Sequence, residues 1–293
     1  KQHRLDDAEK VLSRFKYPDI PALLASIRES LHEETTSKKE SFFQKKYKKP
    51  ILLAFMVASF NQLSGINVLL YYAKDIFEMA GANSENALFQ SALVGAINVV
   101  FTTVGLVLID RAGRKKLLAV GSAGMAVCLG TVGYAFASGV GGKMVLAGFL
   151  GYICFFAFST GAVIWVYISE IFPNRVRGRG QAFGSFTHWV WNAVIAWMYP
   201  IAAGLLFSIG TYLFNVSDTP AQADMQTPAS IVAQADNANN GTISAETLQN
   251  ICKGSPFFLF SVMMVLQLVL VIRYMPETKG VSLEEIQKRL QIE

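Results

Sequence analysis

Six separate runs of apolar residues constrain this chain more than any other feature of its sequence. A helix needs about 20 residues to cross about 30 Å of hydrocarbon, and each run is close to that length. The runs lie at 51–73, 88–109, 117–138, 144–169, 183–209 and 256–274. The chain is 52% hydrophobic and only 16% charged, a composition typical of membrane proteins with several spans. We therefore expect an all-α membrane protein with six transmembrane helices.

The apolar runs also divide the chain into segments. The first segment is polar and basic, and apolar periodicity at Leu5–Phe15 and Pro21–Leu31 predicts short amphipathic helices in it. The predicted order is a cytoplasmic helical segment at 1–49, spans one to five at 50–214, an extracytoplasmic polar insert at 215–254, the sixth span at 255–275 and a cytoplasmic end at 276–293. The chain begins with Lys1 in a charged segment without the apolar core of a signal peptide, so we expect it to be part of a longer protein.

Lysine and arginine predict the orientation of the spans. Of the 26 basic residues, 23 fall in the two terminal segments and in the loops after the second and fourth spans. Only Lys74, Lys143 and Lys253 fall on the opposite side. By the positive-inside rule, both ends of the chain should be cytoplasmic. The net charge of +5 then follows from topology, without a nucleic-acid partner.

The insert at 215–254 is rich in Ala, Asn, Gln and Thr and lacks apolar periodicity. Within it, Asp236–Thr247 resembles a calcium-binding EF-hand loop in its first Asp, in Gly241 and in Ile243. Ala238 and Thr247 stand where ligands should be, so a flexible outer loop is the favoured interpretation and no metal site is predicted.

The apolar stretch Phe60–Tyr72 contains unusually many uncharged hydrogen-bonding side chains around one glycine: Asn61, Gln62, Ser64 and Asn67. Such groups cost several kcal/mol each when they are left unpaired in hydrocarbon, so they need partners or water. Neutral donors and acceptors suit a ligand rich in hydroxyls, whereas a charged ligand would call for a fixed opposite charge.

Other predicted spans carry polar or indole side chains of the same character: Asn98, Trp165, His188, Trp189, Trp191 and Asn192. His188 and Asn192 are four residues apart and so share a helical face. Indole and amide groups together can stack on a sugar ring and bond its hydroxyls. The alternative is that these groups bond across packed helices without contacting any ligand.

Several function classes are not favoured by the sequence. No predicted span has Asp, Glu, Lys or Arg at its centre, which argues against an ion pump run by this segment alone. The sequence has no nucleophile elbow, no metal-spaced His or Cys set and no phosphate-binding loop. We therefore predict neither an enzyme nor a bound cofactor.

Four motifs together resemble the sugar porter branch of the major facilitator superfamily. They are Gln62-Leu-Ser-Gly-Ile-Asn67 with Tyr71-Tyr72, Asp110-Arg-Ala-Gly-Arg114-Lys115, Ser169-Glu-Ile-Phe-Pro173 with Arg177-Gly178, and Pro276-Glu-Thr-Lys-Gly280. The resemblance covers nearly the whole chain except the insert. It implies a carrier of two six-span halves, of which this chain resembles the second with the central cytoplasmic helices.

The resemblance also implies roles for individual residues. Sugar contacts are implied at Gln62, Asn67, Asn98, Trp165, Trp189 and Asn192. Asn61 and His188 stand at further positions of the site but depart from the residue types usual there. Tyr71 and Tyr72, with the helix break at Gly65, would form an outer gate.

A second implied group is a cytoplasmic charge network that ties span ends together in one conformation and separates in the other. Its implied members are Asp110, Arg111, Arg114, Glu170 and Arg177. The alternative is that these charges only enforce the topology of the chain.

The function that the resemblance implies is transport of a monosaccharide by alternating access, in an inner or plasma membrane. The implied partners are the sugar, the lipid bilayer and an N-terminal six-span half, with proton symport and uniport both open. Two alternatives also stay open, namely a membrane sugar sensor or scaffold on the same fold, and a porter for a non-sugar polyol or organic solute.

One local prediction follows from spacing alone. On a regular helix, Gln62 and Asn67 lie about 140° apart around the axis. For both side chains to reach one sugar, the helix must bend or unwind near Ser64 and Gly65.

Overall fold

The computed structural model describes residues 10–13, 21–22, 24–25, 41–213 and 245–292. Side chains are described in these ranges except at 202–213, 245, 246 and 284. The predicted insert therefore lies outside the described residues as far as 244, as does most of its EF-hand-like stretch. Most of the two predicted N-terminal helices also lies outside, although residues 10–13 are helical.

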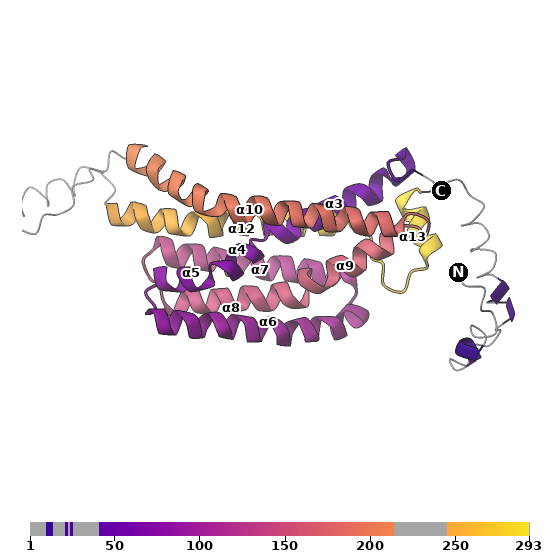
Figure 1. Cartoon of the computed structure of the whole chain (residues 1–293), viewed down its shortest axis with the longest axis horizontal. Coiled ribbons are helices and arrows are strands. Elements are labelled where there is room, and N and C mark those ends of the chain that lie inside the picture. Colours follow the sequence, from indigo (N-terminus) through magenta and orange to yellow (C-terminus); the bar gives the residue numbers. More distant parts are fainter. Residues whose placement is uncertain (1–9, 14–20, 23, 26–40, 214–244, 293) are drawn as a thin grey trace, which may run out of the picture.

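The described chain is a bundle of helices that run along one long axis (Figure 1). A short 3-10 helix, η1 (Lys45–Tyr47), precedes the helices α3 (Lys48–Leu63), α4 (Ile66–Tyr71), α5 (Ala73–Met79), α6 (Ser84–Ala112), α7 (Arg114–Ala137), α8 (Lys143–Phe158), α9 (Thr160–Ile171), α10 (Arg177–Leu213), α12 (Ala245–Tyr274) and α13 (Leu283–Leu290). No strand occurs in the described ranges, so the predicted all-α fold is confirmed.

All six predicted spans are helical. By length and composition, five stretches of the described chain are able to cross a membrane: Lys45–Tyr71, Ser84–Ala112, Arg114–Ala137, Lys143–Ile171 and Thr247–Tyr274. The predicted fifth span corresponds to α10, whose 37 residues are long enough to cross as well. Its side chains are described at 177–201, a stretch that carries the polar His188 and Asn192.

Two of the spans are interrupted. The first breaks between α3 and α4 at Gly65, as the sequence predicts. The second breaks between α8 and α9 at Ser159, whose φ of −113° and ψ of −94° lie outside the helical region. This second break is not predicted from the sequence, because no proline marks it and its only signal is the polar run Ser159-Thr160-Gly161 inside an apolar stretch.

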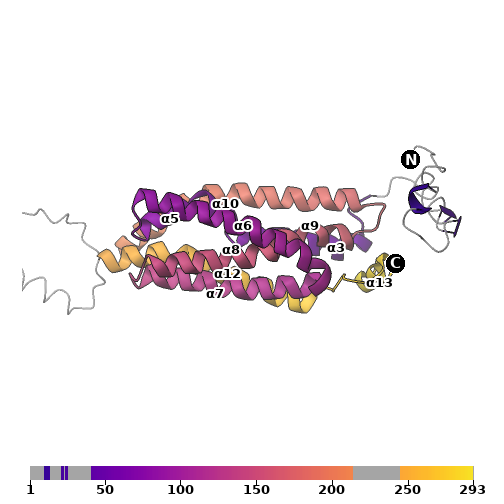
Figure 2. The same ribbon diagram turned by 90° about the horizontal axis from the view of Figure 1, so that it is seen from below.

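Helix α7 packs between α8 and α12, α8 also contacts α6, and α10 packs on α3 (Figures 1 and 2). The closest approaches use glycines, as expected for membrane helices. A Cβ added to Gly254 of α12 would lie 2.5 Å from the carbonyl oxygen of Gly133 of α7. Helix α12 begins at Ala245, ten residues before the predicted sixth-span segment at 255–275, and Gly254 lies in this additional part.

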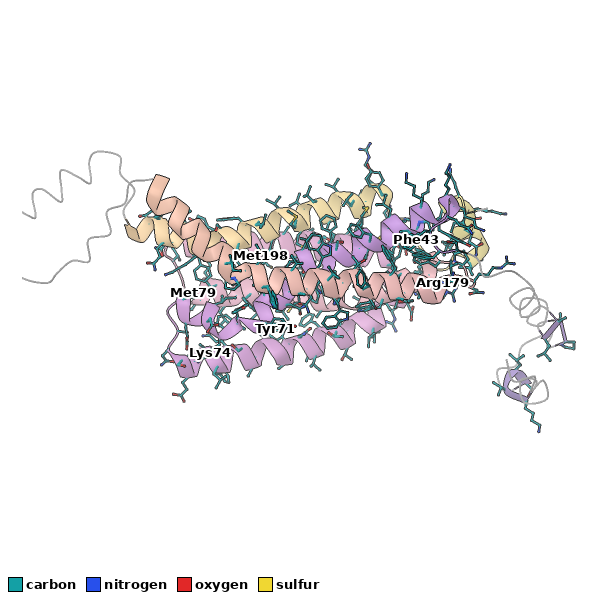
Figure 3. All side chains as sticks on the ribbon, turned by 45° about the horizontal axis from the view of Figure 1, so that its top comes forward. Phe43, Tyr71, Lys74, Met79, Arg179 and Met198 are labelled. Atoms are coloured by element: carbon teal, nitrogen blue, oxygen red, sulfur yellow. The ribbon has the colours of Figure 1, made fainter. Side chains whose placement is uncertain are left out.

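The bundle has two apolar cores, one toward each end. The first joins residues of α4, α5, α6, α7, α8 and α12. The second joins α3 and α9 to Phe42, Tyr47 and the buried face of α13. Phe43 and Arg179 lie at the end of the second core, and Lys74 and Met79 lie at the opposite end (Figure 3). We call the end that holds α13 and the start of α3 the basic end, because Lys45, Lys46, Lys48 and Lys49 lie there.

Candidate functional site

The candidate site is built at the break between α3 and α4. Helix α3 ends at Leu63, and Gly65 adopts a left-handed conformation with φ 82° and ψ 10°. The hydroxyl of the buried Tyr152 lies 3.1 Å from the carbonyl oxygen of Ser64 and donates to it. This bond from α8 satisfies a carbonyl group near the end of α3 inside the apolar interior. The break is therefore held by a neighbouring helix.

The break brings the two predicted amides together. Asn67 Nδ2 donates to Gln62 Oε1 at 2.9 Å and to Asn192 Oδ1 at 2.8 Å. Gln62 and Asn192 are buried, and Asn67 is partly buried. The structure thus brings α3, α4 and α10 to one polar point.

The same network extends in two directions from Gln62. Its Nε2 lies 3.0 Å from His188 Nε2 and 3.2 Å from His188 Nδ1, so it can donate to whichever ring nitrogen is unprotonated. It also lies 3.1 Å from Asn61 Oδ1. Asn61 Nδ2 reaches the carbonyl oxygen of Thr160 at 3.4 Å, which links the break in the first span to the break in the fourth.

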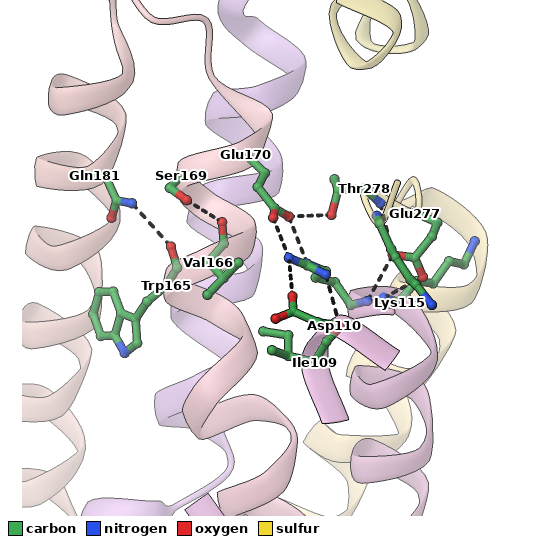
Figure 4. Close-up of polar contacts among 12 residues, drawn as sticks. Ile109, Asp110, Lys115, Trp165, Val166, Ser169, Glu170, Gln181, Glu277 and Thr278 are labelled. Carbon is green, nitrogen blue, oxygen red and sulfur yellow. Dashed lines mark hydrogen bonds and ion pairs between the residues drawn. The ribbon is translucent and has the colours of Figure 1, made fainter. Parts of the chain in front are cut away.

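Aromatic rings lie beside this network. The rings of Trp165 and His188 are 5.0 Å apart at their centroids, and those of His188 and Trp189 are 5.3 Å apart. Trp165 is positioned through its own carbonyl oxygen, which accepts from Gln181 Nε2 at 3.2 Å (Figure 4). Trp189 is 61% exposed, so much of its indole surface is free to contact a ligand.

We call Asn61, Gln62, Asn67, His188 and Asn192 the amide cluster. Four of its members are uncharged amides, and His188 can be neutral. Each member has a hydrogen-bond partner within the described structure. Because these bonds join neutral donors and acceptors, sugar hydroxyls can replace them one for one without any charge being buried.

Three predicted site residues have no hydrogen bond or ring contact with the amide cluster in the described chain. Asn98 is partly buried on α6, where its Oδ1 accepts from Thr102 Oγ1 at 3.3 Å, and no contact with the cluster is seen in the described chain. Tyr71 is 59% exposed (Figure 3), whereas the ring of Tyr72 lies 5.3 Å from that of Tyr199 on α10. The two tyrosines of the predicted gate therefore differ in their surroundings.

The basic end holds the predicted charge network in part. Arg114 forms two bonds to Glu170, from Nε to Oε2 at 3.1 Å and from Nη2 to Oε1 at 2.8 Å (Figure 4). Its Nη2 also lies 3.3 Å from Asp110 Oδ1. The guanidinium is largely buried, and its Nη1 donates to the Ile109 carbonyl oxygen at 3.0 Å. This group ties the start of α7 to the ends of α6 and α9.

Glu277 also lies at the basic end, although it was not among the residues predicted for the charge network. Its carboxylate accepts from the backbone N–H groups of Arg114 at 2.9 Å and Lys115 at 3.2 Å, and from those of Thr278 and Lys279. The carboxylate therefore caps the N-terminus of α7, where negative charge is favoured. Partial burial acts to raise the pKa of Glu277, but these four N–H bonds outweigh it and hold the pKa below its usual value.

Two predicted members of the charge network are not joined to it through their side chains. Arg111 is exposed, and only its carbonyl oxygen takes part, accepting from Lys279 Nζ at 2.6 Å. Arg177 Nε is buried without a hydrogen-bond partner in the described chain. Thr278 is joined instead, since its Oγ1 donates to Glu170 Oε2 at 2.6 Å.

Sequence reasoning missed some residues that shape the site. Tyr152, Thr160 and Phe260 were not selected, because each looks like an ordinary span residue and acts only through a contact made in three dimensions. Glu277 and Thr278 carried a signal, since they belong to the motif Pro276–Gly280. That motif served only to identify the family.

Comparison with known proteins agrees with this geometry. A family described as "Sugar (and other) transporter" matches residues 1–290. The D-xylose-proton symporter of Escherichia coli K12 is 32% identical over 237 residues, which are 81% of this chain and 40% of the symporter. The arabinose-proton symporter of Bacillus subtilis is 29% identical over 98% of this chain and 53% of its own length. The glucose facilitated diffusion protein of Zymomonas mobilis is 32% identical over 79% of this chain and 41% of its own length.

Solved structures show the same likeness. The proton:xylose symporter XylE bound to 6-bromo-6-deoxy-D-glucose is 29% identical, with a TM-score of 0.70, and the match covers 99% of this chain and 52% of XylE. The inward open conformation of XylE from E. coli gives a TM-score of 0.60 at 26% identity, over 97% of this chain and 50% of XylE. The chain thus spans about half the length of the relatives it matches. Its motifs, its fold and the match over residues 1–290 show that the chain belongs to the sugar transporter family of the major facilitator superfamily.

Proposed function

We propose that this chain forms the C-terminal half of a carrier that moves a monosaccharide across a membrane by alternating access. The observation that carries this proposal is the amide cluster, which gathers neutral hydrogen-bonding side chains of α3, α4 and α10 at a helix break inside an apolar bundle. Broken helices at the level of the substrate are a recurring design of secondary transporters.

The chemistry of the cluster supports a sugar over an ionic solute. Among the described residues of the cluster there is no Asp, Glu, Lys or Arg, so nothing there balances a charged ligand. The relatives named above are a D-xylose symporter, an arabinose symporter and a glucose diffusion protein. The substrate class that fits both observations is a pentose or hexose.

Each part of the cluster takes a distinct role in this proposal. Gln62, Asn67 and Asn192 exchange their mutual bonds for bonds to sugar hydroxyls. His188 and Asn61 orient Gln62 from its two sides, and the indoles of Trp165 and Trp189 stack on the sugar ring. Asn98 and the Tyr71–Tyr72 pair complete the site when the N-terminal half of the carrier and the sugar close around it.

The charge network supplies the conformational switch in this proposal. Arg114, Glu170 and Asp110 tie span ends together at the basic end, which the positive-inside rule makes cytoplasmic. Such pairs bias a two-state equilibrium when they exist in one state only. Arg111 and Arg177 take partners in the other state or from the other half.

Proton coupling would use a carboxylate from the other half of the carrier. The amide cluster holds none in the described chain, and the relatives include both proton symporters and a facilitated diffusion protein. In this proposal, a coupled carrier takes its proton-carrying carboxylate from the N-terminal half.

The test is uptake of radiolabelled D-xylose, L-arabinose and D-glucose into vesicles that contain the complete protein. The expected result is saturable uptake of at least one sugar, with faster exchange when the same sugar is present inside. Sugar binding without counterflow would show a sensor or scaffold instead. Inhibition by amino acids or organic ions, with no effect of these sugars, would show a porter for another solute.

A further inference from the structure

A cleft of about 710 Å³ opens at the basic end between the first turns of α3, the last turns of α12 and α13. We propose that this cleft binds one anionic phospholipid. Its wall has two chemical parts, a basic rim and an apolar floor, and the residues of the floor lie deeper in the bundle than those of the rim. The proposal rests on the membrane embedding of the family and does not depend on which solute is carried.

The basic rim consists of Lys49, Arg273 and Arg289. Lys49 and Arg273 are exposed, and Arg273 has no charged partner in the described part of the chain. Lys49 Nζ contacts Gln291 Oε1, a neutral partner. Arg289 Nε pairs with Glu285 Oε1 at 3.1 Å, and both side chains are about half exposed. Among the described side chains, three cations against one carboxylate leave the rim with excess positive charge.

The apolar floor begins one turn deeper on each span. Lys49, Leu53 and Met56 recur at helical spacing on one face of α3, and Leu270 precedes Arg273 by three residues on α12. From Lys49 to Met56 the helix rises about 10 Å, so the floor extends into the hydrocarbon while the rim stays at the headgroup level.

The floor continues inward as a narrow apolar crevice along the same seam. The crevice shares Leu53, Met56 and Leu270 with the cleft and reaches Phe60 and Gln267. The apolar lining of the cleft and the crevice therefore continues on α3 from Leu53 to Phe60. A fatty acyl chain can lie along this lining from the cleft.

The basic rim and the apolar floor together determine which class of ligand fits the cleft. A free phosphate or a short acidic peptide would use the basic rim and leave the apolar floor exposed. A neutral phospholipid would cover the floor and leave the excess positive charge unbalanced. An anionic phospholipid matches both parts, as basic pockets between membrane helices generally do. Its headgroup bridges α13 to α3 and α12, so bound lipid should stabilise the basic end.

The experiment uses the full-length protein, delipidated in a neutral detergent. Phosphatidylglycerol and phosphatidylcholine are added in separate titrations, and lipid retention by native mass spectrometry and the melting temperature are recorded. We expect preferential retention of phosphatidylglycerol and a rise in melting temperature with it. Arg273→Gln should weaken retention about fivefold, which is the effect expected for one basic residue near a membrane surface.

Two further variants separate the rim from the floor. Met56→Trp fills the floor without changing charge and should also reduce retention of phosphatidylglycerol. Lys116→Gln removes an exposed basic residue in the first turn of α7 that does not line the cleft, and it should behave like wild type.

Equal retention of the two lipids by wild type would overturn the proposal. It would also be overturned if Arg273→Gln retained as much phosphatidylglycerol as Lys116→Gln. The last titration uses glycerol 3-phosphate, a soluble phosphate without acyl chains. If it raised the melting temperature as much as phosphatidylglycerol does, the cleft would be a site for a soluble phosphate rather than a lipid.

Discussion

Asn67 Nδ2 lies 2.9 Å from Gln62 Oε1, although a regular helix would place these two residues on well-separated faces. The contact exists because Gly65 breaks the span between them. Asn67 also reaches Asn192 on α10, so one break joins three helices at a polar point. The break is therefore the feature on which the candidate site depends.

Gly65→Ala should disrupt this break. A Cβ at Gly65 would lie 2.5 Å from the ring of Phe260, and the φ of 82° disfavours any side chain. We expect a loss of about 1 to 3 kcal/mol in stability, together with weaker sugar binding. The melting temperature and the sugar affinity of the complete protein measure the two effects.

Gly95→Ala is the matched control. This glycine lies inside α6, and a Cβ there would meet no atom within 4 Å. Alanine is the better helix former, so the control should be as stable as wild type or slightly more stable. Equal behaviour of the two variants would show that the break does not require glycine.

Arg114→Lys should weaken the basic end while keeping its charge. A lysine cannot form the two parallel bonds that Arg114 makes to Glu170, nor reach the Ile109 carbonyl oxygen at the same time. We expect a loss of about 1 to 3 kcal/mol, because the partners are partly buried and become unsatisfied. Thermal melting of the complete protein measures this loss.

Arg289→Lys is the control, because it makes the same exchange of a guanidinium for an ammonium group at an exposed site. Arg289 pairs with Glu285 one turn away, and both side chains are about half exposed. Exposed pairs contribute about 0 to 1 kcal/mol, so this variant should melt close to wild type. A melting temperature of Arg114→Lys equal to that of Arg289→Lys would contradict a structural role for the Arg114–Glu170 pair.

Glu277 predicts a pH dependence. Its pKa in the folded protein lies below the ordinary value of 4.5, so the ionised carboxylate stabilises the fold. This contribution is complete above about pH 4.5 and is lost as the pH falls through the lower folded value. Glu277→Gln lacks the titrating group. The difference in melting temperature between wild type and Glu277→Gln should therefore shrink on acidification, and a difference that grows would reverse the assigned sign.

Much of the fold was predictable from the sequence, because the length of an apolar run can be read from one segment without knowledge of its neighbours in space. The break at Gly65 was predictable as well, since the spacing of Gln62 and Asn67 required it. The break at Ser159 and the bond from Tyr152 to Ser64 were not predictable, because each depends on which helices become neighbours. The placement of Asn98 apart from the cluster has the same cause.

The measurement that tests the central claim most directly is equilibrium sugar binding by Asn67→Ala in the complete protein. The substitution leaves Gln62 Oε1 and Asn192 Oδ1 without their shared donor and removes a proposed sugar contact. We use Asn86→Ala as the control, because the Asn86 side chain is exposed in the first turn of α6. The account predicts that Asn67→Ala binds its sugar at least about tenfold more weakly, while Asn86→Ala binds like wild type. Unchanged affinity in Asn67→Ala would contradict the claim that the break at Gly65 assembles the sugar site.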